Sequence, residues 1–214
     1  MFFATKFRSV LAVLFAFICA QSVQAQTVLL KDINSQPSTL DTICSSFSAV
    51  LNDVIIFCAV SHASGEELWI SDGTVDGTRL LKDIYAGPSD SSPSQFIKLG
   101  SKVYFRATTA EAGTELWETD GTEVGTVMVH DFMEGAEDGF PDDLTTFDDR
   151  LFLSARSTEA GDELWSYDPV TETTSLVKDI RVGDSGSGPR LLTVSGSHLF
   201  FVANDGTVGG ELWK

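Results

Sequence analysis

The sequence predicts an all-β protein, and within that class a β-propeller of four-stranded antiparallel blades. Two observations predict it. The chain contains four tryptophans, each follows a Glu-Leu pair, and each lies 48 residues from the next. Short strand patterns also recur in the same order around the tryptophans. A fixed period of this length indicates one supersecondary unit that is used several times. The four tryptophans are Trp69, Trp117, Trp165 and Trp213.

Each repeat begins with two apolar strand patterns that a short turn separates. The second pattern is a continuous apolar run, as in VYFRA at 103–107. The turns contain Gly, Asn or Asp, which tolerate the positive φ that tight hairpins need. First strands are predicted at 47–51, 96–99, 143–147 and 190–194. Second strands are predicted at 55–59, 103–107, 151–155 and 199–203.

The second half of each repeat is a strand ending in Glu-Leu-Trp, a tight turn and a fourth strand. The turn reads DGTVDGT at 72–78 and DGTEVGT at 120–126. Asp72 and Asp120 can accept hydrogen bonds from backbone N–H groups two residues on. One carboxylate per turn is too few for calcium, so both aspartates are predicted to be structural. Fourth strands are predicted at 79–84, 127–132 and 175–180.

The apolar pattern requires each sheet to be covered on both faces. Adjacent residues of a strand point to opposite faces, so Leu68 and Trp69 are both buried only if another sheet lies on each side. Radial packing of small sheets meets this need, and it is the arrangement of a β-propeller. A parallel β-helix is the competing fold, but hairpin turns inside each unit oppose it.

The two ends of the repeat region complement each other. The last unit stops at GELWK, 210–214, before any fourth strand, whereas TVLLKDI at 27–33 reads as a fourth strand with nothing before it. Residues 27–33 are therefore expected to close a four-bladed ring against the last blade. The alternative is a fragment of a longer array. The predicted repeat domain spans residues 26–214, with units that end at about 84, 132, 180 and 214.

Residues 1–25 are predicted to be a secretory signal peptide. Lys6 and Arg8 form a positive n-region, and the apolar run 10–20 is too short to span a bilayer. A small-residue cleavage site precedes Gln26. The mature protein is expected to be secreted, extracellular or at the cell surface, with the periplasm as the alternative, and to insert no segment into a membrane.

The three cysteines fall into two groups. Cys19 ends the apolar run of the leader, and a lipoprotein anchor is disfavoured there because the bulky Ile18 precedes it. Cys44 and Cys58 follow the cleavage site, and an oxidising compartment allows them to form a disulfide. Two buried free thiols are the alternative, since a sequence does not supply the Cα separation that a bridge requires.

The chain is acidic, with 14 Lys and Arg against 31 Asp and Glu. Nucleic acid and anionic lipid need cations that neutralise their phosphates, so neither is expected as a partner. The acidity suits a soluble exported surface and divalent cations.

The segments ELWISDGTVDGT (67–78) and ELWETDGTEVGT (115–126) resemble the ELWxxDGT repeat family of bacterial secreted and surface proteins. The KDI strands and the linker GPSDSSPSQF resemble that family's unit as well. The resemblance spans residues 27–214 and implies an exported, propeller-like repeat protein without catalytic residues. Two units depart from the pattern. The third has Asp168-Pro169 and VTETTS where DGTxxGT is expected, and the fourth lacks the turn.

Five carboxylates within ten residues form the most asymmetric feature of the sequence. They occupy a linker that is mostly Ser, Gly and Pro in the second unit. They are a candidate calcium site, and a solvated acidic loop is the alternative, because their order matches no known calcium loop. No other cofactor is expected. The five residues are Glu134, Glu137, Asp138, Asp142 and Asp143.

The glutamates before the Leu-Trp pairs recur in every unit. An active site needs one asymmetric pair of acids in one cleft, so this set is expected to have a local role that is repeated in each blade. The sequence shows no zinc spacing, phosphate-binding glycine loop or nucleophile elbow. No catalytic residue is predicted. The glutamates are Glu67, Glu115, Glu163 and Glu211.

The expected function is a non-catalytic repeat scaffold that binds a ligand through loops on one propeller face. Linkers between units share that face with the loops between second and third strands, and the uniform DGT turns lie on the opposite one. Binding usually lies on variable loops that a rigid scaffold holds. The expected ligand is a carbohydrate, a surface polymer or a protein. The alternative is a secreted enzyme of the glycosidase or lyase type that uses a carboxylate cluster.

Overall fold

The computed structural model describes residues 29–33, 44 and 48–214, and these residues form fifteen β-strands in four antiparallel sheets. None of them lies in a helix, and no membrane-spanning helix occurs among them. The all-β prediction is therefore confirmed for this part of the chain. The predicted signal peptide, residues 1–25, lies outside the described residues.

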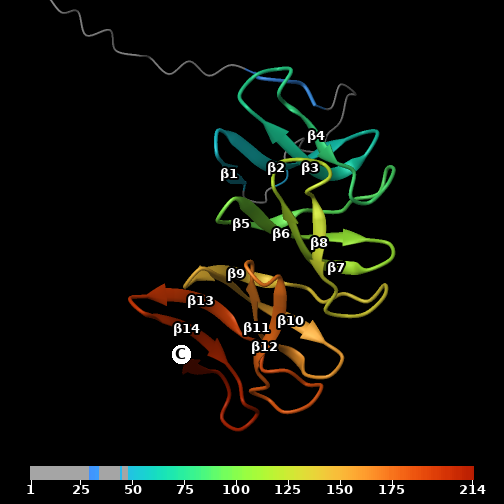
Figure 1. Cartoon of the computed structure of the whole chain (residues 1–214). Coiled ribbons are helices and arrows are strands. Elements are labelled where there is room, and N and C mark those ends of the chain that lie inside the picture. The colour runs from blue at the N-terminus through green and yellow to red at the C-terminus, as the bar shows by residue number, and fades with distance from the viewer. Residues whose placement is uncertain (1–28, 34–43, 45–47) are drawn as a thin grey trace, which may run out of the picture.

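Each sheet is a meander in which strands that follow one another in the sequence are hydrogen-bonded neighbours (Figure 1). The first sheet contains β1 (Ala49–Leu51), β2 (Val54–Ser61), β3 (Gly65–Ser71) and β4 (Arg79–Lys82). The second contains β5 (Ser94–Leu99), β6 (Lys102–Thr109), β7 (Gly113–Thr119) and β8 (Val127–His130). The third contains β9 (Asp142–Phe147), β10 (Arg150–Ser157), β11 (Gly161–Asp168) and β12 (Thr173–Lys178). The fourth contains β13 (Arg190–Ser195), β14 (His198–Ala203) and β15 (Glu211–Trp213).

The observed fourth strands end two residues earlier than the predicted ones. The sequence predicts a strand over 79–84, but β4 ends at Lys82. The backbone N–H of Ile84 donates to the Glu67 carboxylate, 2.8 Å away, and is therefore not available to a strand ladder. The end of the strand is thus decided by a side chain that lies 17 residues earlier.

Three hydrophobic clusters lie between successive sheets and hold the array together. Between successive sheets, the leucine of a Leu-Trp pair faces the following sheet and the tryptophan faces the preceding one, as expected for adjacent strand residues. Each of the three clusters therefore contains the leucine of one repeat and the tryptophan of the next. These pairs are Leu68 with Trp117, Leu116 with Trp165, and Leu164 with Trp213.

The sheets follow one another along an arc. Contacts between the first strands link β1 to β5, β5 to β9, and β9 to β13, so these strands lie along the inner edge of the array. The first and fourth sheets lie at opposite ends of it (Figure 1). This order agrees with the radial packing that the apolar pattern predicts, but the described residues do not close into a ring.

The predicted closure by residues 27–33 is not formed. Residues 29–33 lie in no strand, and β15 has β14 as its sheet partner among the described residues. The Lys31 ammonium instead donates to two backbone oxygens of the first DGT turn, Val75 O at 3.2 Å and Thr78 O at 2.5 Å. These contacts hold the N-terminal segment at the first sheet, far from the last.

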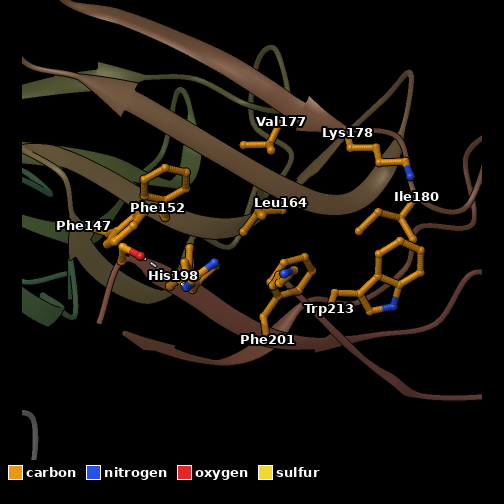
Figure 2. Close-up of a pocket in the computed structure, with 12 residues that line it drawn as sticks. Phe147, Phe152, Leu164, Val177, Lys178, Ile180, His198, Phe201 and Trp213 are labelled. Carbon is orange, nitrogen blue, oxygen red and sulfur yellow. Dashed lines mark hydrogen bonds between the residues drawn. The ribbon is translucent and has the colours of Figure 1, made fainter. Parts of the chain in front are cut away.

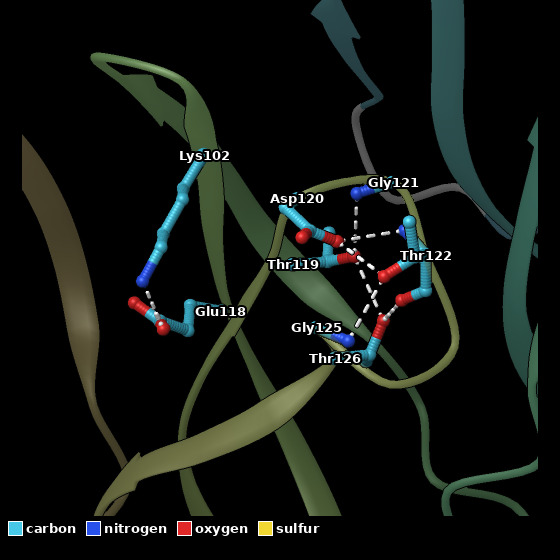
Figure 3. A network of polar contacts seen from close by, with 8 residues as sticks. All are labelled: Lys102, Glu118, Thr119, Asp120, Gly121, Thr122, Gly125 and Thr126. Atoms are coloured by element: carbon cyan, nitrogen blue, oxygen red, sulfur yellow. Dashed lines mark hydrogen bonds and ion pairs between the residues drawn. The ribbon is translucent and has the colours of Figure 1, made fainter.

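The DGT turns are pinned by their own side chains (Figure 3). Asp120 accepts a hydrogen bond from the backbone N–H of Thr122 at 2.9 Å and one from its hydroxyl at 2.6 Å. These bonds lower the pKa of Asp120. Thr126 closes the turn by donating its hydroxyl to Thr122 O at 2.7 Å. Asp72 makes the same contacts with Thr74 in the first repeat, so both aspartates serve the turn rather than a ligand.

The two cysteines that follow the leader form a disulfide. Cys44 and Cys58 are bonded through their sulfurs, with a Cα–Cα distance of 5.6 Å. This separation falls in the range that a bridge requires. The bond ties the segment before the first sheet to β2.

Candidate functional site

In the first three repeats, the glutamate before the Leu-Trp pair holds the linker that leads to the next sheet. The side chains of Glu67, Glu115 and Glu163 are fully buried. Glu67 accepts hydrogen bonds from the Ile84 N–H at 2.8 Å, from the Ser91 N–H at 3.0 Å and from the Ser91 hydroxyl at 2.6 Å. One carboxylate therefore fixes both ends of a linker.

The same arrangement recurs in the next two repeats. Glu115 accepts hydrogen bonds from the Phe132 N–H at 2.9 Å and the Gly139 N–H at 2.7 Å. Glu163 accepts one from the Arg181 N–H at 3.0 Å. Because these acids accept hydrogen bonds from linker backbone inside the protein, they have the local, repeated role that the sequence predicts.

Burial changes the pKa of two of these glutamates, Glu67 and Glu115. Desolvation raises the pKa of both Glu67 and Glu115 to about 7, although their backbone hydrogen bonds oppose the shift. In the unfolded chain both groups ionise near their ordinary pKa of 4.5. Between pH 4.5 and about pH 7, the two glutamates are therefore more protonated in the folded chain than in the unfolded chain. This proton binding stabilises the folded state, and the stabilisation is lost as the pH rises through 7.

We therefore expect the free energy of unfolding to fall between pH 5 and pH 8, by about 1–3 kcal/mol for each glutamate. Urea unfolding at several pH values measures this slope. The double variant Glu67→Gln/Glu115→Gln is the control, since glutamine stays neutral throughout. A double variant that keeps the wild-type slope would contradict the assignment.

The five carboxylates of residues 134–143, which we call the acidic segment, do not converge on one point. Asp138 accepts a hydrogen bond from the Thr114 N–H at 2.8 Å, and Asp143 accepts one from the Leu192 N–H at 2.9 Å. These two side chains therefore cap backbone groups of two different sheets. Carboxylates that cap backbone N–H groups in this way stabilise loops.

The other three acids of the segment point elsewhere. Asp142 accepts a hydrogen bond from the Gln95 side-chain amide, whereas Glu134 and Glu137 are exposed. Within the described residues, the one group of three potential metal ligands consists of Cys44, Cys58 and Glu66. Its two sulfurs are joined in the disulfide, so neither is a thiolate that could bind a metal.

A groove on the linker side of the array is the strongest candidate for a binding site. One cavity of about 320 Å³ and another of about 390 Å³ share Arg106 and Phe140 in their linings, and we call the two together the loop-side groove. The smaller cavity is also lined by Glu66, Ser92, Ser94, Thr108 and Thr114. The larger is also lined by Asp142, Asp143, Ser154, Asp162, Gly188, Pro189 and Arg190.

Arg106 is fixed in the middle of this groove. It lies on β6, and its Nε donates to the Ser94 hydroxyl at 2.8 Å. Its Nη1 lies 3.6 Å from the Asp142 carboxylate. The guanidinium is thus held between the first residues of β5 and β9, which reduces the conformational entropy that it would lose on binding a ligand.

Phe140 is presented to solvent by an unusual backbone conformation. Its side chain is 53% exposed and its φ is 47°. The residues at the same place in the neighbouring repeats, Ser92 and Gly188, also have positive φ. This conformation disfavours a residue with a Cβ, and the structure retains it through a hydrogen bond of 3.1 Å from the Phe140 N–H to Thr114 O. Because the conformation recurs in the repeats, it belongs to the linker geometry, and the exposed aromatic side chain is what distinguishes Phe140.

Asp162 lies at the start of β11 and lines the larger cavity of the loop-side groove. The Ser154 hydroxyl donates to its carboxylate at 2.5 Å. Burial raises the pKa of Asp162, and the nearby charge of Asp142 raises it further. The larger cavity is therefore lined by three aspartates, Asp142, Asp143 and Asp162, and burial raises the pKa of Asp162.

An apolar cavity of about 420 Å³ lies between the third and fourth sheets (Figure 2). It is part of the inter-sheet core, because Leu164, Phe201 and Trp213 belong to the third hydrophobic cluster. Lys178 lies over the Trp213 ring, 5.1 Å from its centroid. At the same place in the first repeat, Lys82 donates to the DGT turn of the next repeat. The described fourth repeat has no such turn, so we assign this cavity to packing.

No family model matches the chain, and neither does any curated protein. Several solved structures resemble it distantly, among them the following two. One is the computationally designed Ika8 protein, with 14% identity, a TM-score of 0.41, and coverage of 78% of this chain and 44% of that one. The other is the Bacteroides ovatus xyloglucan PUL GH43B, with 14% identity, a TM-score of 0.42, and coverage of 78% and 36%. This chain spans less than half of either structure, and likenesses this weak carry no argument about function.

Most residues of the loop-side groove were missed by sequence reasoning. Arg106, Phe140 and Arg190 do not belong to any motif, and the calcium hypothesis drew attention to Asp142 for a different reason. The available signal is departure from the repeat. Arg106 stands where the first and third repeats have Cys58 and Ser154. A residue that departs from the repeat without weakening its core is therefore a candidate for a binding role.

Proposed function

We propose that this chain is a secreted or cell-surface binding protein that holds a carbohydrate in the loop-side groove without transforming it. Its four sheets would be blades of a propeller-like repeat protein of the ELWxxDGT type. The observation that carries this proposal is the combination, in one groove, of the exposed ring of Phe140 with fixed donors and acceptors around it.

The chemistry of the groove suits a neutral, hydroxyl-rich ligand. The guanidinium groups of Arg106 and Arg190 can donate hydrogen bonds to a ligand, and the carboxylates of Asp142 and Asp162 can accept hydrogen bonds from it. Vicinal sugar hydroxyls both donate and accept, so they satisfy the two kinds of group together. The apolar face of a sugar ring can stack on Phe140. The carboxylates of Asp142 and Asp162 offset the positive charges of Arg106 and Arg190, so the groove disfavours a strongly ionic ligand.

The proposed location rests on the sequence features of an exported protein and on the disulfide. Cys44 and Cys58 are bonded in the structure, and such bonds persist in oxidising compartments. A position outside the cell would also bring the groove into contact with surface polysaccharides, which is the setting that a non-catalytic scaffold needs.

Phe140→Ala is expected to weaken binding at least about tenfold, because the variant removes a stacking surface worth roughly 1.4 kcal/mol or more. A panel of soluble neutral polysaccharides, followed by calorimetric titration of the best ligand, measures the change. Val124→Ala is the matched control, since Val124 is 88% exposed and lies in a DGT turn. Equal affinity in the wild type and Phe140→Ala would place the ligand elsewhere.

A second candidate, glycoside hydrolysis, is favoured by the unequal carboxyl groups of the larger cavity. Asp162 would act as the general acid, since burial raises its pKa, and Asp142 would act as base or nucleophile. Release of reducing ends from a polysaccharide that binds, abolished in Asp162→Asn with binding retained, would establish this reaction. Binding without any release supports the scaffold.

A further inference from the structure

The two cavities of the loop-side groove are copies of one site, displaced by one repeat. Five residues that line the larger cavity stand 48 positions after residues that line the smaller one. The same spacing separates the tryptophans, so the groove follows the period of the scaffold. The five pairs are Ser92 and Phe140, Ser94 and Asp142, Arg106 and Ser154, Thr114 and Asp162, and Phe140 and Gly188.

The backbone around these positions is also the same from repeat to repeat. In each linker one residue with positive φ donates its N–H to a carbonyl oxygen at the start of the preceding third strand. These bonds, at 3.1–3.2 Å, join Ser92 to Glu66, Phe140 to Thr114, and Gly188 to Asp162. Equivalent contacts therefore place the two cavities at equivalent positions in successive repeats.

The two cavities follow one another along the inner edge of the array. Ser94, Asp142 and Arg190 are the first residues of β5, β9 and β13, and these strands contact one another in that order. Arg106 and Phe140 line both cavities. A ligand that fills both cavities therefore passes the exposed ring of Phe140 on its way from one repeat to the next.

The two copies carry different polar groups. In the smaller cavity, the hydroxyls of Thr108 and Thr114 pair at 2.8 Å. In the larger cavity, Asp142 stands at the position of Ser94, and a second aspartate, Asp162, replaces the threonine. Hydroxyls both donate and accept hydrogen bonds, whereas ionised carboxylates only accept them. Consecutive parts of one ligand would therefore meet different groups.

The first repeat uses the same two positions for a covalent bond. Cys44 and Cys58 stand 48 positions before Ser92 and Arg106, which line the smaller cavity. The two cysteines form the disulfide, and Cys58 is buried. In the first repeat these positions thus serve a structural link between the linker and β2. The pair of ligand sites accordingly belongs to the second and third repeats.

We infer that the loop-side groove binds one linear polysaccharide chain across two repeats, with consecutive parts of the chain in the two cavities. The inference rests on the proposed carbohydrate site and specifies its ligand as a chain rather than a single sugar. Two linked sites bind a chain more tightly than they bind its separate units, because the second contact becomes intramolecular. The ring of Phe140 would stack on the sugar that joins the two parts.

A length series tests this inference on the full chain. The probes are size-fractionated fragments, from one to about six sugar units, of the neutral polysaccharide that binds tightest in the panel above. Calorimetric titration measures their affinities. We expect the affinity to rise at least about tenfold between the single sugar and the fragment that spans both cavities, and to stay constant beyond that length.

One variant in each cavity makes the test specific. Thr108→Val removes a hydroxyl that lines only the smaller cavity, and Arg190→Ala removes a guanidinium that lines only the larger one. Each should weaken binding of the longest fragment about two- to tenfold, since each removes hydrogen-bonding groups. The matched controls are Thr173→Val, which alters a hydroxyl pair on β12, and Arg79→Ala on β4; both side chains are exposed and neither lines the groove.

The outcomes separate this inference from the proposed function. A single sugar that binds as tightly as the longest fragment, or a longest fragment that is unaffected by one of the two cavity variants, would overturn the inference. The proposed site would still stand if that binding depended on Phe140. Binding that ignores Phe140→Ala, or no binding to any polysaccharide, would overturn both.

Discussion

Replacing Trp117 by alanine is expected to lower the free energy of unfolding by about 3–5 kcal/mol. Trp117 is 8% exposed and belongs to the cluster that joins the first two sheets, together with Leu68 and Phe105. Truncation removes the indole ring and leaves a cavity between the first two sheets. The cavity persists because neither sheet can move into it independently. Urea unfolding followed by circular dichroism measures the loss.

The control for this variant is Val124→Ala, which changes a side chain that is 88% exposed. It should alter stability by no more than about 0.5 kcal/mol. Trp117→Phe should lie between the two, because phenylalanine fills part of the space. A near-neutral effect of Trp117→Ala would mean that the two sheets do not depend on this contact, and the packing between repeats would need another explanation.

Glu115→Ala is expected to destabilise the fold by about 2–6 kcal/mol, since it strands two buried donors that contribute about 1–3 kcal/mol each. These donors are the N–H groups of Phe132 and Gly139, which lie 2.9 and 2.7 Å from the carboxylate. Their loss should also loosen the linker between the second and third sheets. Urea unfolding gives the energy, and hydrogen exchange of the two amides reports the linker.

Glu111→Ala is the matched control, because Glu111 is an exposed glutamate four residues earlier in the chain. It should have little effect on either measurement. If Glu115→Ala unfolded like Glu111→Ala, or left both amides protected, the glutamate would not be holding the linker.

The linker glutamates also bear on the candidate site. The linker that Glu115 holds ends at Gly139, next to Phe140, whose ring lines both cavities of the loop-side groove. Glu115, which has buried counterparts in the neighbouring repeats, therefore positions Phe140, which has no aromatic counterpart there. Repeated residues build the scaffold here, and a residue that breaks the repeat provides the proposed recognition.

Much of the architecture follows from the sequence because its signals are local or periodic. The Glu-Leu-Trp pattern predicts that adjacent side chains are buried on opposite faces of one sheet, and Leu68 and Trp117 do meet between two sheets. The DGT turns are equally local, since the Asp120 bonds reach residues two positions away. Such contacts do not depend on how the sheets are arranged, so the residue types alone predict them.

Ring closure was not predictable in this way. The ends of the repeat region have complementary patterns, but complementarity does not specify whether one chain satisfies both ends. That depends on the rotation accumulated from one sheet to the next, which is set by side-chain packing in the three inter-sheet clusters. In the structure Lys31 remains at the first DGT turn, and residues 29–33 do not pair with β15.

The sequence by itself determined the all-β class, the 48-residue unit and the roles of residues that act within one unit. Only the tertiary structure decided which linker each buried glutamate holds, that Cys44 and Cys58 are bonded, and that Arg106 and Phe140 share a groove. The physical reason is distance along the chain. Arg106 and Phe140 belong to different repeats, and their proximity is produced by sheet packing, which no local pattern encodes.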